Sequence, residues 1–246
     1  MPLTWLTTLC DQLAADRAIL MGAPSPFEPF ARHQQERFGL TGSDLRLPEH
    51  FRGEWDRAEV CFLGPHVIFD PKELPPPPDC PLTDYVAYCS QRPGRRDPYG
   101  HYQAITGGRP WLAAELVHWP CEKELALQVL GSPRGPAIVD AGLALTWSLL
   151  AESPVRTLVL TGNDALRWVL PRLGRKGGKL PGVTQLHGQV MGEYDLPGAP
   201  GRRLRVVASC HWSRELPLFM RKLPGLQAMQ VSEAIDAARQ MISAVL

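Results

Sequence analysis

The stretch VRTLVLTGNDAL, Val155 to Leu166, decides the fold that we expect for this chain. Val155 to Leu160 is a short apolar run with the residue types of a buried strand, and Gly162 follows it at a turn. Asn163 to Leu170 then has a helical pattern, with Asn163 placed to cap it. A buried strand that turns directly into a helix is the building unit of α/β proteins.

Similar apolar runs recur along the chain and alternate with helical patterns. The expected strands are Ala58 to Leu63, Ala113 to His118, Val155 to Leu160 and Arg203 to Ala208, and the other expected helices are Leu3 to Leu20, Ala137 to Ala151 and Ser232 to Val245, with Ser232 as a cap. We predict an α/β fold, a three-layer α/β/α sandwich around a mainly parallel four-stranded sheet, as one domain over residues 1–246. Leu74 to Pro81 is expected to be an extended connector, and Gln91 to Pro110 a long loop of the kind that forms lids or mobile segments.

Composition indicates an ordinary globular protein, with 44% hydrophobic and 21% charged residues. The six cysteines include no CxxC pair, and several lie in apolar runs, so we expect buried reduced thiols rather than disulfides or zinc ligands. Charged residues interrupt the amphipathic N-terminal stretch, which argues against a signal peptide or a membrane span and favours a cytoplasmic protein. HWPCEKE, His118 to Glu124, lacks metal-ligand spacing, and we expect no metal.

The net charge of +1 conceals an uneven distribution of charge. Ser153 to Lys222 holds twelve Lys or Arg against four Asp or Glu, a local +8 that leaves −7 for the rest of the chain. Such a segment is typical of a surface that binds an anionic polymer, and it is equally compatible with a solvated basic face.

Ligands of open parallel sheets bind beyond the carboxyl ends of the strands. The residues that follow the expected strands there are Gly64 to Asp70, His118 to Cys121, Gly162 to Asp164 and Ser209 to Ser213. His211 is among them, and Cys210 beside it points elsewhere on a strand end, so the two form no nucleophile–base pair. The GRKGGK run from Gly174 lacks a preceding strand and a Ser or Thr after the lysine, which excludes a phosphate loop. A histidine that donates to an oxygen gaining negative charge suits the departure of a leaving group from a sugar.

The order of these stretches resembles the uracil-DNA glycosylase superfamily over roughly Ala58 to Leu226. The matching stretches are FLGPHVIFDP at Phe62 to Pro71, ELVHWP at Glu115 to Pro120, VRTLVLTGNDAL at Val155 to Leu166 and SCHWSREL at Ser209 to Leu216. The resemblance implies an enzyme that flips an altered base out of DNA and cleaves its N-glycosidic bond without a metal or cofactor. It makes His211 the group that donates to the pyrimidine O2 as the base leaves, with Trp212 in place of the usual proline.

The same resemblance supplies the expected DNA contacts. The family's loop after its last motif enters DNA, so Arg214 matches that loop and Leu216 is the candidate wedge for the gap left by the flipped base; an ordinary apolar residue opening a helix is equally compatible. The complete set of expected DNA contacts is Ser209, Ser213, Arg214, Leu216, Arg175, Lys176 and Lys179.

The first motif departs from the family pattern. Gly64, Pro65 and His66 stand where the family has a water-activating Asp or Asn two residues after the glycine, so His66 or Asp70 is the candidate base. Asp97 is a second candidate, because Asp97-Pro98-Tyr99 has the residues of the water-activating motif in one branch of the family. That motif needs a buried strand immediately before it, and the residues before Asp97 do not have a strand pattern. Phe69 is a candidate stacking surface for the base, or a core residue.

The second motif also differs from the family pattern, and this difference changes the base that we expect the protein to recognise. Glu115 and His118 are the expected base contacts on this strand, and Glu115 stands near the asparagine that reads uracil in the family. An ionised carboxylate only accepts hydrogen bonds, so it suits a base with an exocyclic amino group; the alternative is a structural pair with an arginine.

Three functions follow as hypotheses. The first is a monomeric DNA glycosylase for a deaminated or damaged base, the second is a catalytically silent member that binds DNA or a free base, and the third is a small-molecule hydrolase on the same scaffold. DNA is the expected partner under the first two.

Overall fold

The computed structural model describes residues 52–53, 57–68, 99–121, 128, 130–133, 135–176, 178–212 and 222–246. Several sequence predictions lie outside these residues: the N-terminal helix, the proline-rich connector, and the residues Phe69, Asp70, Asp97, Ser213, Arg214 and Leu216. The chain divides into two compact units, one of Met1–Arg52, His66–Arg92 and Glu115–Glu152, the other of Gly53–Pro65, Pro93–Ala114 and Ser153–Leu246.

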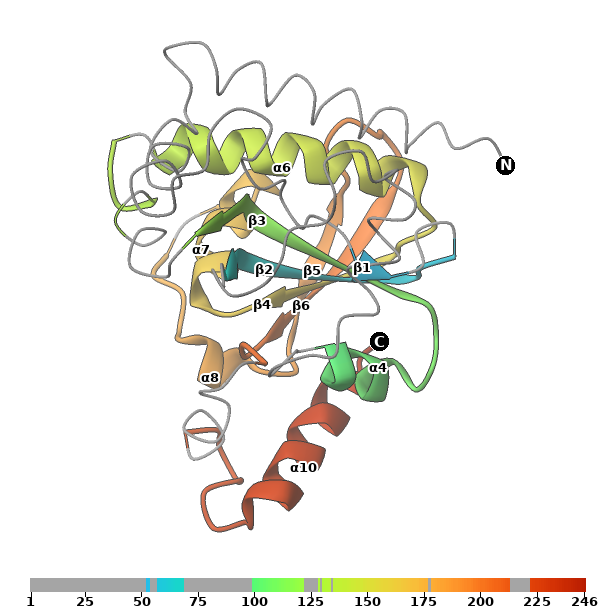
Figure 1. Ribbon diagram of the computed structural model, residues 1–246, viewed down its shortest axis with the longest axis vertical. Helices are drawn as coiled ribbons and strands as arrows, with labels where there is room; N and C mark the ends of the chain where they lie inside the picture. The colour runs from blue at the N-terminus through green and yellow to red at the C-terminus, as the bar shows by residue number, and fades with distance from the viewer. Residues whose placement is uncertain are drawn as a thin grey trace, which may run out of the picture. The chain divides into compact units, whose positions relative to one another are not determined.

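The fold is α/β, with a mixed and mostly parallel sheet flanked by helices (Figure 1). Its strands, in the order β1-β3-β2-β4-β6-β5, are β1 Arg52–Gly53, β3 Trp111–Cys121, β2 Val60–Ile68, β4 Thr157–Thr161, β6 Arg203–Ser209 and β5 Val190–Asp195. Strands β2, β4 and β6 run parallel, and β5 is antiparallel to β6. The four predicted strands are therefore present as β2, β3, β4 and β6.

The prediction of a four-stranded sheet was wrong in its count, because β5 and the two-residue β1 are added. The β5 sequence VMGEYD is polar and largely solvent-facing, and it pairs with β6 through a register shift between Val190 and Gly192. An exposed edge strand has no need of the apolar run by which buried strands are recognised. Its sequence therefore gave no strand signal.

One face of the parallel strands carries the core of the second unit. Val60 and Phe62 of β2, Val159 of β4 and Val207 of β6 alternate with residues of the opposite face and pack in a buried cluster. Two helices supply the other side of this cluster: α4, Tyr99–Thr106, and α10, Val231–Ser243 (Figure 1). Tyr102 of α4 stacks on Phe62, with ring centroids 3.9 Å apart.

Helix α4 corrects the prediction that Gln91 to Pro110 is one long loop. The helix is only eight residues long, and its sequence YGHYQAIT contains a glycine and two aromatic rings, all of them weak helix formers. Tyr102 and Ile105 are buried among the core residues, so tertiary packing stabilises a helix that local propensity does not favour.

The remaining helices occur close to their predicted positions. They are α6, Gly135–Glu152, and α7, Asn163–Arg172. The single turn α8, Val183–Leu186, was not predicted. Neither predicted cap is formed. Asn163 is the first residue of α7, and its Oδ1 accepts from the backbone N–H of Val183 (2.8 Å) instead. Ser232 lies inside α10, whose N-cap is Gln230.

Candidate functional site at the carboxyl edge of the sheet

The strand order marks the carboxyl ends of β2 and β4 as the edge at which open α/β sheets bind ligands. The chain passes from β2 to β3 on one side and then to β4 on the other, which makes the β2–β4 junction a topological switch point. Thr161 is paired with Ser209, so β4 and β6 end at one edge, whereas β2, whose Leu63 is paired with Leu160, continues to Ile68. The hydroxyl of Thr161 donates to the carbonyl of Leu63 (3.1 Å) and so ties the end of β4 to β2.

His211 lies at this edge, beside the turn after β4. It follows β6 by two residues, and its side chain is partly exposed. Gly162 has φ +93°, and a Cβ added there would lie 3.7 Å from the Cβ of His211. The N–H of Gly162 donates to the carbonyl of Ser209 (2.8 Å). Gly162 and His211, two of the residues predicted at this edge, therefore lie side by side, and glycine fits because its backbone adopts this positive φ without strain.

Cys210, on the N-terminal side of His211, belongs to the interior. Its side chain is fully buried in the core, and this burial raises the pKa of the thiol to about 12. A thiol with so high a pKa supplies no thiolate nucleophile near neutral pH. Cys61 is likewise a buried thiol outside any disulfide, so the prediction of buried reduced thiols is confirmed for both residues.

His187 is a buried histidine that the sequence interpretation missed. It follows α8, its Nδ1 accepts from the N–H of Cys210 (3.0 Å), and its Nε2 lies 3.0 Å from the carbonyl of Ala238 in α10. An acceptor at Nδ1 and a donor at Nε2 describe the neutral imidazole with its proton on Nε2. Burial lowers the pKa of His187, against a smaller opposing effect of the bond to Ala238. Nothing in PGVTQLHGQV distinguishes this histidine from a loop residue, because its partners lie 23 and 51 residues away.

Trp212, on the C-terminal side of His211, is also an interior residue. Only 1% of it is exposed, and its Nε1–H donates to the hydroxyl of Ser209 (2.8 Å). Its ring lies against His101 and His187, with centroid separations of 5.1 and 5.8 Å. Ser209 is itself fully buried. Its hydroxyl therefore serves this interior contact, and the predicted contact with DNA finds no exposed group at this position.

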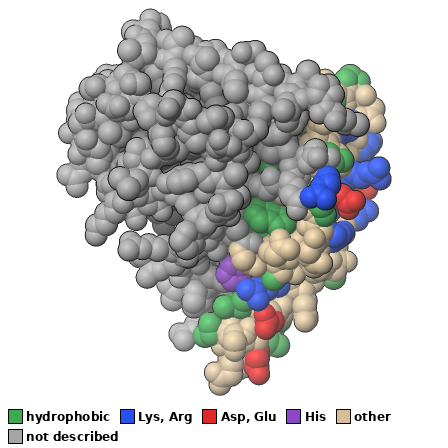
Figure 2. All heavy atoms as spheres, turned by 45° about the vertical axis from the view of Figure 1, so that its right-hand side comes forward, with side chains coloured by type: hydrophobic (Ala, Val, Ile, Leu, Met, Phe, Trp, Pro, Cys, Tyr) green, Lys and Arg blue, Asp and Glu red, His purple; other side chains and the backbone are tan. Residues whose placement is uncertain are grey.

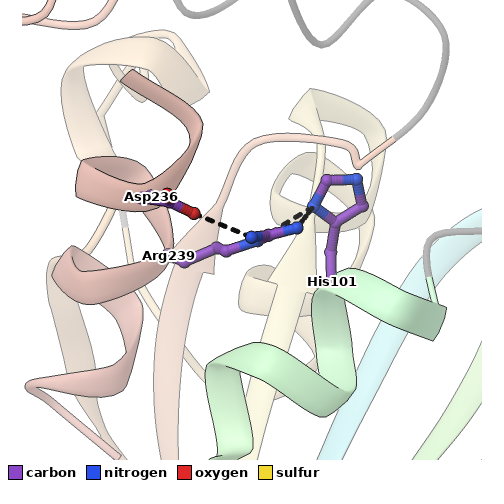
Figure 3. Close-up of polar contacts among 3 residues, drawn as sticks. All are labelled: His101, Asp236 and Arg239. Carbon is purple, nitrogen blue, oxygen red and sulfur yellow. Dashed lines mark hydrogen bonds and ion pairs between the residues drawn. The ribbon is translucent and has the colours of Figure 1, made fainter. Parts of the chain in front are cut away.

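A polar cluster connects α4 with α10 beside Trp212 (Figure 3). Arg239 donates from Nε to the Nδ1 of His101 (3.2 Å), and its Nη2 lies 3.1 Å from the same atom. Its Nη1 binds Asp236 at 2.8 Å. Partial burial, followed by the positive charge of Arg239, lowers the pKa of His101. The imidazole is thereby held neutral with Nδ1 as its acceptor.

The other predicted site residues are placed only in part. Gly64 and Pro65 are buried within β2, and His66 follows them in the same strand. Glu115 and His118 lie in β3, where Glu115 is partly buried. The side chains of His66 and His118 are outside the described residues. Their assignments, like those of Phe69, Asp70 and Asp97, stay predictions.

The basic segment separates into two groups in the structure. One group lies at the amino edge of the sheet, away from His211: Arg202 donates to the carbonyls of Ser153 and Val155, Arg203 lies 3.7 Å from Asp195, and Arg205 lies 3.8 Å from Glu193. The second group follows the C-terminal end of α7 and includes Arg175, Lys176 and Lys179. On the face drawn in Figure 2, basic side chains of the described residues lie among acidic ones.

Neither protein-family models nor curated proteins match this chain. Within the described residues, no three His, Cys, Asp or Glu side chains are grouped as a metal site would require. None of the described helices combines the length and apolar character needed to cross a membrane. The described part of the site is a partly exposed imidazole at a switch-point edge, with buried, hydrogen-bonded residues on both sides of it.

Proposed function

We propose that this protein is a DNA glycosylase-like enzyme that cleaves the N-glycosidic bond of a deaminated or damaged base, uracil or a related one. The single observation that carries the proposal is the position of His211, partly exposed at the carboxyl edge where β4 and β6 end beside the β2–β4 switch point. The similarity to the uracil-DNA glycosylase superfamily in the order of stretches supports the same assignment. It also supports the finer architecture, a three-layer α/β/α sandwich in one domain.

In the proposed reaction His211 donates a hydrogen bond to the base. The bond between the sugar C1′ and the base nitrogen breaks, the base leaves with the bonding electron pair, and the oxygen that gains charge accepts from the imidazole. Water adds to C1′ and gives up a proton to a base, for which His66 and Asp70 are candidates and Asp97 an alternative. Catalysis in this scheme requires no metal or cofactor.

DNA binding is proposed for the second basic group and for the loop after Trp212. Arg175, Lys176 and Lys179 neutralise phosphates, and Arg214 and Leu216 enter the duplex where the base leaves it. Gly64, Pro65, Phe69, Glu115 and His118 complete the proposed base pocket. We propose a monomeric cytoplasmic protein.

A catalytically silent protein that binds DNA or a free base is the second candidate. The observation that favours it is the buried Gly64-Pro65 pair in β2, because it lacks the carboxylate or amide that positions water in the family. A small-molecule hydrolase is compatible with the α/β scaffold. That function does not explain the basic loop after α7.

The test uses labelled single- and double-stranded oligonucleotides that contain uracil, hypoxanthine or xanthine. After incubation with the protein, alkali cleaves the strand wherever a base has been removed. We expect cleavage on at least one substrate with the native chain and a rate lower by roughly a hundredfold or more with His211→Ala, while DNA affinity stays the same. Intact DNA binding without an abasic site on any substrate contradicts the enzyme and supports the silent protein. A ligand affinity independent of salt, with none for DNA, supports the hydrolase.

A further inference from the structure

We propose that the buried His187 is a positioning residue that fixes the backbone carrying His211; this inference rests on the proposed function. The two imidazoles are 24 positions apart in the sequence, and Cys210 links them in the structure. The N–H of Cys210 donates to Nδ1 of His187, and His211 is the next residue. His187 thus acts through the backbone without touching a substrate.

The imidazole of His187 continues the hydrogen-bond ladder of the sheet. Beside β6, the N–H of Gly188 donates to the carbonyl of Ala208 (2.9 Å), and the N–H of Ala208 donates to the carbonyl of Gln189 (3.0 Å). Cys210 follows β6, and its N–H is the next one on this side of the backbone. Nδ1 of His187 accepts the hydrogen bond from this N–H, where a neighbouring strand would supply a carbonyl. The ladder therefore extends one residue beyond the end of β6, up to His211.

The opposite side of the same backbone is held as well. On the β4 side, the carbonyl of Ser209 accepts from Gly162, and beyond His211 the indole of Trp212 donates to the hydroxyl of Ser209. The second nitrogen of His187 donates to Ala238, which fixes the ring against α10. His211 consequently projects from a backbone that is bound on both of its flanks. A preorganised donor of this kind is what stabilisation of a leaving group demands.

Three variants test the assignment. His187→Leu removes the acceptor for Cys210, His187→Asn restores an acceptor near the position of Nδ1, and Gln185→Ala is the matched control at an exposed position of α8. In each, three quantities are measured: the exchange rate of the Cys210 amide, the titration of the His211 imidazole by NMR, and kcat and KM for abasic-site formation.

For His187→Leu we expect the Cys210 amide to exchange at least roughly fivefold faster, as the loss of about one hydrogen bond requires. We also expect a shifted His211 titration and a kcat lower by roughly tenfold to a hundredfold, with KM little changed. His187→Asn recovers most of each quantity, and Gln185→Ala changes none of them. A general loss of stability would instead speed exchange throughout β6 and α10.

Different results would contradict the positioning role of His187 and the proposed glycosylase function. If His187→Leu exposes the Cys210 amide to exchange while the His211 titration and kcat stay native, His187 has no positioning role. If the native chain releases no base from any oligonucleotide, the proposed enzyme fails, and the His211 titration in the His187 variants still decides whether His187 positions it.

Discussion

At the scale of single residues, two histidines near the end of β6 have opposite environments. His211 is partly exposed, whereas His187 is 2% exposed and binds a backbone N–H on one ring nitrogen and a backbone carbonyl on the other. Protonation of His187 would turn Nδ1 into a second donor facing the N–H of Cys210. The neutral state of His187 is therefore part of the folded structure.

This environment predicts a stability that falls on acidification. The pKa of His187 is lowered in the folded protein, so below the ordinary histidine pKa of about 6.5 the unfolded chain binds a proton that the folded chain does not. Stability contributed by the neutral ring is complete above that pH. It is lost as the pH falls toward the folded-state pKa, by at most about 1.4 kcal/mol per pH unit.

Urea unfolding between pH 7.5 and 5 measures the effect, with His187→Asn as the comparison; these limits span the window of about one unit on either side of the histidine pKa. We expect a flatter pH dependence in the variant. His101 has a lowered pKa as well, so the variant His101→Asn is measured in parallel to separate the two. Identical pH profiles for His187→Asn and the native chain would contradict the assignment.

Gly162 offers a second test at this scale. Its φ of +93° strains any residue with a Cβ, while a Cβ there would meet His211 only at an ordinary contact distance of 3.7 Å. Gly162→Ala should therefore cost about 1–2 kcal/mol of stability through the backbone rather than through a clash. Gly100→Ala, in α4 with nothing within 4 Å of the added atom, should leave stability equal or higher. Equal losses in both variants, measured by urea unfolding, would be inconsistent with this explanation.

Sequence reasoning located His211 but not the residues that hold it. An apolar run that stops at SCHW marks a strand end, and the strand order then brings it beside Gly162. The role of His187 depends on a bond to Ala238 across 51 residues, and no local pattern encodes such a bond. Trp212 was identified only as a replacement for the usual proline, and its burial in the interior was not predicted.

At the scale of elements, α4 and α10 form the packing layer that supports the site. Tyr102 and Ile105 bury one side of α4, and Ala234, Ala238 and Ile242 bury one side of α10. Arg239 adds the polar connection to His101. The short α4 depends on these contacts for its helical state.

Replacing Arg239 should therefore loosen α4 from α10. Arg239→Met keeps much of the apolar stem and removes the donors to His101, and we expect a loss of about 1 kcal/mol in urea unfolding. Asp236→Asn alters only the exposed end of the cluster, where the expected change is under about 0.5 kcal/mol. A greater loss in Asp236→Asn than in Arg239→Met would overturn this account of the cluster.

Helices and strands were predictable where their buried residues leave an apolar pattern in the sequence. The runs in β2, β4 and β6 and the helix α6 are mostly apolar, and each occurs where the pattern indicated. The strand β5 and the helix α4 carry no such pattern. The first is an exposed edge paired to β6, and the second is stabilised by core contacts supplied from β2 and α10.

At the scale of the whole molecule, the basic residues of the segment Ser153 to Lys222 lie in two different environments. Arg203 and Arg205 lie in the first half of β6 beside acidic partners, about 20 Å and about 13 Å along the strand from its other end. Lys176 and Lys179 lie beyond α7, and both are exposed. Only the second pair is expected to release counterions when DNA binds.

The salt dependence of DNA affinity distinguishes the two groups. The double variant of Lys176→Gln and Lys179→Gln should make the slope of log affinity against log salt shallower by roughly 2. Arg203→Gln with Arg205→Gln removes the same charge and should leave the slope close to native. Equal reductions in both double variants would show that binding follows net charge alone.

The central claim is that His211 stabilises the departing base, and single-turnover base release tests it most directly. Native protein and His211→Ala are compared on the oligonucleotide that gives abasic sites, at protein concentrations that saturate each one. We predict a rate lower by roughly a hundredfold or more in His211→Ala, with DNA affinity unchanged. Base release at the native rate by His211→Ala would contradict the account.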